Sequence, residues 1–173
     1  MDGPASPAGG ASDAGRQRVG RFDFAAHHCF ACGQLNMAGL RLDLHAAGDR
    51  CWTETSLPAR FQGWDGITHG GVVSAILDEV MAWSLIGADR LGFTARLEVD
   101  FRRPVPVERA IRAEGWIATR RRRRFDTQAQ ITDAATGEVL AEARAIYLAA
   151  PREQEANLRE RYDIRVVDEA APR

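Results

Sequence analysis

The stretch that decides the fold is His69-Gly70-Gly71, followed directly by VVSAILDEVMAWSLI at residues 72–86. Residues 72–86 contain neither proline nor glycine, and most of their side chains are apolar. This pattern predicts a helix that is apolar on nearly every side. Such a helix has to be wrapped by other elements, because exposing that surface to water is unfavourable.

Asp78 is the side chain in this helix that most needs an explanation. A carboxylate in apolar surroundings is costly unless it is paired or performs chemistry. Gly71, Ser74 and Asp78 are spaced three and four residues apart, so they lie on one stripe of the helix. The glycines allow a reacting carbonyl to approach the free N–H groups of the first turn, as an oxyanion site requires. Glu79, turned about 100° round the helix, is predicted to face a polar edge or an arginine.

The distance between Gly71 and Asp78 predicts a dimer. Seven residues separate them, or about 10 Å along a helix axis. One helix does not easily bring both groups to the same atom. If they cooperate, two chains must present them to each other across a composite site. The alternative for Asp78 is a cap or an ion-pair partner at a dimer seam.

Composition predicts one domain and excludes several function classes. The 173 residues are 45% hydrophobic, and the net charge is −1, so no overall field draws the chain to nucleic acid or to an acidic membrane. All 23 basic residues are arginine, which excludes a lysine Schiff base. Three cysteines without a leader sequence predict a reducing, cytoplasmic location. Asp78 and Glu79 interrupt the one candidate membrane span.

Three segments are predicted along the chain. Residues 1–20 lack apolar anchors and are predicted to be a disordered tail, residues 21–150 to form the domain, and residues 151–173 to be a charged extension with a short helix at Glu153–Arg161. Cys29 and Cys32 form a Cys-x-x-Cys beside two histidines. A zinc site would need a second half-motif, which is missing, so we assign no metal; a redox pair and a structural role are the other readings.

Alternating patterns predict strands on both sides of the helix. The chain turns at Gly48-Asp49 and again at 133–137, where glycine fits a positive φ. One long buried helix among antiparallel strands predicts an α+β fold, with the sheet rolled round the helix. The predicted strands are Leu40–Leu44, Cys51–Leu57, Phe93–Phe101, Ile111–Thr119, Phe125–Thr132 and Val139–Leu148.

These residues resemble a known family. His69-Gly70-Gly71 with an acid nine positions after the histidine, then Gly92-Phe93-Thr94 opening a strand that ends Phe101-Arg102-Arg103-Pro104, is similar to the hotdog-fold acyl-CoA thioesterases. Within the hydroxybenzoyl-CoA thioesterase superfamily the phenylacetate-pathway branch is the most similar. The resemblance covers about residues 29–148, including Cys-Phe-Ala-Cys-Gly at 29–33.

The resemblance implies roles for particular residues. The Gly71 N–H would polarise the thioester carbonyl, and Asp78 of a partner subunit would be the nucleophile or general base. Thr94 would help to hold the attacking water, and His69 would shape the turn or contact the thioester; a loop histidine and a strand threonine are the plain alternatives. Gly70 belongs to the same substrate-binding turn. Where many relatives carry asparagine this chain has Gly63, with Gln62 beside it, so Gln62 is the candidate substitute.

The five arginines at 120–124 have two main readings. They form either a solvated turn or a clamp for coenzyme A phosphates, since arginine forks match phosphate oxygens. Arg122 and Arg124 of this run, with Arg102 and Arg103 after the preceding strand, are the candidate phosphate ligands. Nucleic-acid binding is the weakest reading, because the domain is near neutral and the run lacks aromatic residues.

The predicted function is hydrolysis of an acyl-CoA thioester to a free acid and CoA. CoA is part of the substrate, and no separate cofactor is predicted. Trp64, Met81 and Trp83 are available to line a pocket for an aromatic or medium-chain acyl group. We expect a homodimer or a dimer of dimers. The alternative is an acyl-CoA binding protein without catalysis; a hydratase is less favoured, because the sequence lacks Asp-x-Asn-x-x-His.

Overall fold

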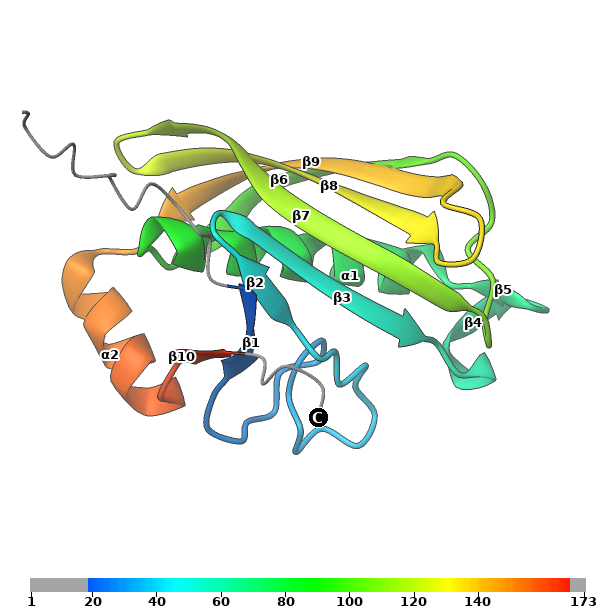
Figure 1. Ribbon diagram of the computed structural model, residues 1–173, viewed down its shortest axis with the longest axis horizontal. Helices are drawn as coiled ribbons and strands as arrows, with labels where there is room; N and C mark the ends of the chain where they lie inside the picture. The colour runs from blue at the N-terminus through cyan, green and yellow to red at the C-terminus, as the bar shows by residue number, and fades with distance from the viewer. Residues whose placement is uncertain (1–18, 169–173) are drawn as a thin grey trace, which may run out of the picture.

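The computed structural model describes residues 19–168, and the remainder of the predicted tail, residues 1–18, lies outside the described residues. A large antiparallel sheet curves around one long helix, α1, as predicted (Figure 1). The strand order is β10-β1-β2-β3-β7-β8-β9-β6, so β6 and β10 are the two edges. The elements are β1 Val19–Asp23, β2 His45–Ala47, β3 Arg50–Ser56, η1 Ala59–Phe61, β4 Gln62–Trp64, β5 Ile67–Thr68, α1 Gly70–Ser84, η2 Leu85–Ala88, β6 Gly92–Phe101, β7 Ala110–Arg121, β8 Arg124–Asp133, β9 Val139–Ala149, α2 Arg152–Tyr162 and β10 Arg165–Asp168.

Helix α1 forms the core together with the concave face of the sheet. Val73, Ile76, Leu77, Val80 and Met81 are at most 1% exposed. The sheet approaches the helix closely because β7 carries a glycine: a Cβ at Gly115 would lie 2.7 Å from the α1 backbone. By length and composition the segment 70–88 would also pass as a membrane span. Its packing against the sheet instead makes it a core helix, and among the described residues its other face is only partly covered.

The strand predicted at Leu40–Leu44 is wrong. Leu42 and Leu44 are buried as the alternation requires, but Arg41 has φ 53°, and regular pairing begins only at His45. The backbone N–H groups of Leu40 and Leu42 instead bond the carbonyls of the preceding loop. Residues 24–44 therefore form one long irregular connection. The β1 strand begins at Val19, inside the range predicted as tail, and pairs with β10, which the patterns did not predict.

A bulge in β6 changes which side chains face the helix. The pairing with β9 shifts between Thr94 and Arg96. Strict alternation would place Thr94 on the face opposite Leu97. Because of the bulge, Thr94 bonds a helix residue while Leu97 and Val99 also pack against the core.

A buried ion pair joins α2 to the domain. Arg90 Nε lies 2.7 Å from Glu155 Oε1, and the two side chains are 9% and 4% exposed. Burial opposes ionisation of Glu155, but the hydrogen bonds from Arg90 and from the Leu91 N–H outweigh it and lower the pKa of the carboxyl. The predicted helix in the C-terminal extension is thus present, and it is anchored through a charge that the core encloses.

Candidate active site

Asp78 is the centre of a small polar cluster between α1 and the sheet. Thr94 Oγ1 on β6 donates to Asp78 Oδ1 at 2.8 Å, and Tyr147 OH on β9 donates to the same oxygen at 2.6 Å. The Tyr147 hydroxyl also lies 2.8 Å from the Asp78 carbonyl oxygen. Two hydroxyls therefore orient one carboxylate oxygen and leave the other unused by these donors. Such a carboxylate is positioned to accept a proton or to attack.

Tyr147 was missed by the sequence reasoning. Its ring is fully buried, and burial together with the nearby Asp78 charge raises the pKa of its hydroxyl, which stays protonated and donates. The signal was present, because a large aromatic residue follows three small ones, Ala141, Ala143 and Ala145, on the same buried face of β9. Nothing in one sequence shows that this face meets Asp78.

The turn before α1 is closed by His69. Its side chain caps the helix, with Nδ1 accepting from the Gly71 N–H at 3.0 Å. The His69 N–H donates to the Phe61 carbonyl at 2.9 Å, which fixes the turn to the short 3-10 helix η1. The N–H that the family resemblance assigns to the thioester carbonyl is thus already paired. The histidine ring is exposed, so a substrate oxygen can replace it as acceptor by a side-chain rotation.

Gly63 and Gln62 lie in the β4–β5 hairpin beside this turn. A Cβ at Gly63 would lie 3.2 Å from both Cα and Cδ2 of His69, a tight contact. Gln62 Oε1 accepts from the Gly66 N–H at 3.3 Å, so its amide serves the hairpin. Gln62 and Gly63 are exposed, and Gly70 lies against the Phe101 ring, 3.4 Å from the place of its missing Cβ.

Helix α1 and strand β6 run in opposite directions. Gly70 meets Phe101, Asp78 meets Thr94, and Leu85 meets Gly92. Gly71 and Asp78 are therefore spread along the same axis within one chain, as their spacing predicts, by about 10 Å. The structure brings Asp78 together with Thr94, and His69 together with Gly71, as two separate pairs.

The candidate arginines also divide into two sets. Arg102 pairs with Glu142 at 2.8 Å and Arg103 with Glu138, both just past the end of β6 that meets the start of α1. Arg124 pairs with Asp126 at 2.6 Å in the β7–β8 hairpin, where Arg122 is the turn residue with φ 50°. Arg124 is paired in register with Leu148, near the opposite end of β6. Within one chain the two sets therefore lie near opposite ends of β6.

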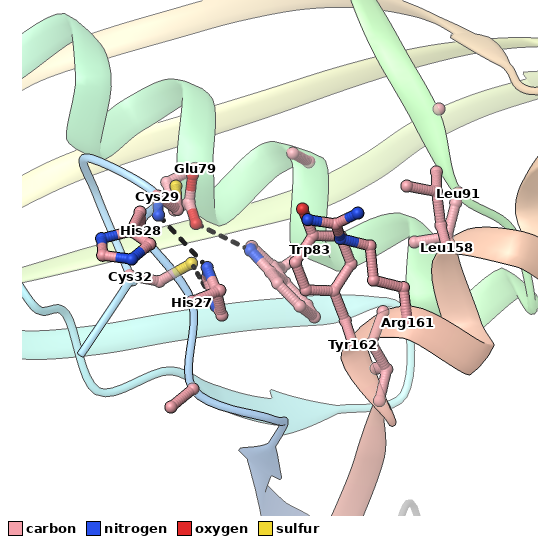
Figure 2. Close-up of a pocket in the computed structure, with 14 residues that line it drawn as sticks. His27, His28, Cys29, Cys32, Glu79, Trp83, Leu91, Leu158, Arg161 and Tyr162 are labelled. Carbon is pink, nitrogen blue, oxygen red and sulfur yellow. Dashed lines mark hydrogen bonds between the residues drawn. The ribbon is translucent and has the colours of Figure 1, made fainter. Parts of the chain in front are cut away.

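Glu79 faces neither a polar edge nor an arginine, which corrects that prediction. It points to the Cys29–Cys32 loop, where one ligand atom from each of Cys29, Cys32 and Glu79 lies within 4.8 Å of the others (Figure 2). The Trp83 indole N–H donates to Glu79 Oε1 at 2.8 Å. A hydrogen bond from Cys32 lowers the pKa of Cys29 to about 5, and burial raises that of Glu79 to about 7. This cluster opens on a cavity of about 810 Å³, lined also by Leu91, Leu158 and Tyr162.

The architecture defines the class: a curved antiparallel sheet wrapped round one central helix is the hotdog fold. The thioesterase superfamily family model matches residues 65–149, from the hairpin before α1 to the end of β9. Residues 65–149 thus match the thioesterase superfamily, and the fold of the described chain agrees with that match. A search of curated protein sequences gave no significant match.

Solved structures agree with this fold. A crystal structure of a thioesterase superfamily protein is 25% identical with a TM-score of 0.65, covering 70% of this chain and 60% of that one. The E. coli PaaI protein from the phenylacetic acid degradation operon is 14% identical with a TM-score of 0.60, covering 64% and 80%. A hypothetical thioesterase protein from Streptococcus pneumoniae, solved with coenzyme A, is 15% identical with a TM-score of 0.56, covering 58% and 81%.

Proposed function

We propose that this protein is an acyl-CoA thioesterase in which Asp78 of one subunit and the Gly71 N–H of another act on one thioester. The observation that carries the proposal is the Asp78 carboxylate oriented by Thr94 and Tyr147. A thioester is an activated acyl group, so the enzyme mainly has to aim a water or a carboxylate and stabilise an oxyanion. One oxyanion donor is worth roughly 10²–10³ in rate.

The edge strand β6 supports the dimer. It pairs with β9 on one side, and among the described strands nothing pairs with its other side. Phe93 and Phe101, near its two ends, are 51% and 55% exposed. A long edge with apolar side chains is prone to pair with another chain. Antiparallel pairing of two β6 strands about their midpoint is the symmetric solution, because a two-fold axis then relates the two copies.

This pairing also completes the site. Thr94 lies near the start of β6 and Phe101 at its end, so antiparallel pairing places the Thr94 end of one strand beside the Phe101 end of the other. Asp78 accompanies Thr94, and the Gly70–Gly71 turn accompanies Phe101. Each composite site would therefore take its acid from one chain and its amide from the other. The partly covered face of α1 would be buried further in the same interface.

The same two-fold symmetry would bring the two sets of candidate arginines, which lie far apart within one chain, close to each other. Arg102 and Arg103 of one chain would lie beside the hairpin with Arg122 and Arg124 of the other. Coenzyme A carries several phosphate oxygens, for which arginine forks are well suited. The aromatic residues near the helix start, Phe101 and the 81% exposed Trp64, favour an aromatic or medium-chain acyl group. The S. pneumoniae structure with coenzyme A is compatible with this class of substrate.

An acyl-CoA binding protein without catalysis is the second candidate. It is favoured by one observation, the Gly71 N–H that is already occupied by His69. Single-turnover assays with a panel of acyl-CoAs, together with equilibrium binding of CoA, separate the two. Release of free acid that depends on Asp78 supports the enzyme; tight binding without release supports the binding protein.

Complementation between two inactive variants tests the composite site. Asp78→Asn removes the acid, and Gly71→Pro removes the amide N–H at a first-turn position where proline is tolerated. In a mixed dimer, one of the two sites has both groups intact. Co-refolded variants should recover roughly a quarter of wild-type activity by random pairing. If each chain carried its own complete site, mixing would restore nothing. Circular dichroism checks that Gly71→Pro retains its helix content.

A further inference from the structure

The Cys29–Cys32 loop and Glu79 form a site that the thioesterase proposal does not use. The two thiols come from the connection between β1 and β2, and the carboxylate comes from the middle of α1 (Figure 2). A zinc site at these thiols would need a further ligand, and the sequence has no second Cys-x-x-Cys half-motif to provide it. The fold supplies it from the same chain instead, because the loop packs directly on the helix.

We propose that Cys29, Cys32 and Glu79 bind a zinc ion, with the fourth position open to the adjacent cavity. Two thiolates and a carboxylate are a donor set that suits tetrahedral Zn²⁺. Around a tetrahedral zinc, with bonds of 2.0–2.3 Å, ligand atoms stand about 3.5–3.8 Å apart. The three atoms already lie within 4.8 Å of one another, so small side-chain rotations bring them to that geometry.

The neighbours of these ligands act as outer partners. Trp83 Nε1–H holds Glu79 Oε1 at 2.8 Å and leaves the second carboxylate oxygen for the metal. His27 Nδ1 accepts from the Cys29 N–H at 3.2 Å, so in the neutral ring the proton is on Nε2, which lies 3.9 Å from Cys32 Sγ. His27 is therefore a donor to the Cys32 sulfur and not a ligand. Partners of this kind orient the ligands of many metal sites.

The position of the site gives the ion a structural task. Residues 24–44 have no regular strand or helix, which is unusual for a connection of this length inside a compact domain. A metal bridge would fasten this connection to α1. Phe24 and Tyr162 already pack on the His27 ring, at centroid distances of 5.0 and 5.2 Å, so the bridge would also steady α2. The inference does not depend on the proposed thioesterase activity.

Metal analysis of the full chain tests the site. Protein purified under reducing conditions, stripped with a chelator and dialysed against Zn²⁺ should retain one zinc per chain. Co²⁺ in its place should give thiolate-to-cobalt charge-transfer absorption. Cys29→Ser, Cys32→Ser and Glu79→Gln should each lose stoichiometric zinc, while Cys51→Ala, which removes a buried thiol outside the cluster, should keep it.

A measurement on the unaltered chain covers the case in which a variant fails to fold. Bound zinc should slow alkylation of Cys29 and Cys32, and a chelator should restore the rate. The proposal is overturned if the wild-type protein retains no zinc, if added zinc leaves both thiols equally reactive, or if a Cys29–Cys32 disulfide is present after purification under reducing conditions. Zinc content equal to wild type in folded Cys29→Ser and Cys32→Ser protein would overturn it as well.

Discussion

Asp78 and Glu79 are neighbours in sequence, and their surroundings differ completely. Asp78 meets two hydroxyls, from Thr94 and Tyr147, on the sheet side of α1. Glu79, about 100° further round the helix, meets two thiols and an indole N–H. The hydroxyls orient the Asp78 carboxylate for the proposed reaction, whereas the thiols would share the proposed zinc ion with Glu79. Two adjacent acids of α1 are thus proposed to have two different roles, catalysis for Asp78 and metal binding for Glu79.

The largest expected effect concerns the Asp78 side. Asp78→Asn keeps the shape of the side chain but removes the base or nucleophile, so we expect acyl-CoA turnover to fall by about 10³-fold. CoA affinity, measured by calorimetry, should change little. Glu114→Gln, a partly exposed acid paired with Arg50 and outside the site, is the matched control. Equal turnover of Asp78→Asn and wild type would remove Asp78 from the chemistry.

The next largest effect is expected on stability, from the ion pair that anchors α2 beside the cavity near Glu79. Glu155→Gln leaves Arg90 buried without its charged partner, which should lower the free energy of unfolding by about 3–5 kcal/mol. Urea denaturation measures this loss. Glu153→Gln, an exposed acid in the first turn of α2, is the control and should change stability little. If activity rather than stability falls with Glu155→Gln, the two sides of α1 are not independent.

The pH dependence of stability follows from the same ion pair. The pKa of Glu155 is lowered in the folded state. The Glu155 carboxylate therefore contributes stability that is fully present above the pKa it has in the unfolded chain. This contribution is lost as the pH falls from about 4.3, the unfolded value, through the folded value. Wild type and Glu155→Gln should therefore differ in unfolding free energy at neutral pH and converge in acid. A constant difference down to low pH would contradict this assignment.

A smaller effect is expected from the hydroxyls around Asp78. Hydrogen bonds to a charged group are worth about 1.5–3 kcal/mol, or roughly 10–100-fold in rate if they act in the transition state. Tyr147→Phe should lower kcat within that range with little change in KM. Thr94→Val should act similarly, and Thr94→Ser, which keeps the hydroxyl, should retain most of the rate. An unchanged kcat in Tyr147→Phe would show that the hydrogen bond from Tyr147 to Asp78 serves structure and not catalysis.

The smallest effect belongs to the arginines. Arg122 sits exposed at a hairpin turn, and no hydrogen bond or ion pair of its side chain occurs within residues 19–168, so it is free to bind phosphate. Arg122→Ala should weaken CoA binding several-fold, more at low salt than at high salt. Arg21→Ala, which removes an exposed arginine on the remote strand β1, is the control. If Arg122→Ala and wild type bind CoA equally well at low salt, the β7–β8 hairpin is a solvated turn that does not bind the phosphates.

Several expectations remain predictions. The three cysteines are free thiols, which is compatible with the predicted reducing cytoplasm, but the location itself is untested. The homodimer, the dimer of dimers and the acyl group are likewise proposals. So is the absence of any cofactor of catalysis, since the proposed zinc ion is assigned a structural task.

The sequence by itself determined the helix, the five longest strands and the identity of the candidate turn, because periodicity and glycine placement are local signals. It predicted Asp78 as a candidate from its spacing within the helix, and the family resemblance added Thr94. It could not predict the β6 bulge that turns Thr94 toward α1, or Tyr147 as the second donor, since both depend on register between strands that are distant in sequence.

Only the tertiary structure decided where Glu79 points. Its thiol partners, Cys29 and Cys32, lie about fifty residues earlier in the chain, in a segment without regular structure, so no periodic pattern connects them. Long-range packing of that loop on α1 created the cluster. The sequence therefore identified Asp78 and Glu79 as residues to explain. The tertiary structure determined which side chains surround each of them, because contacts between distant segments depend on how the elements pack.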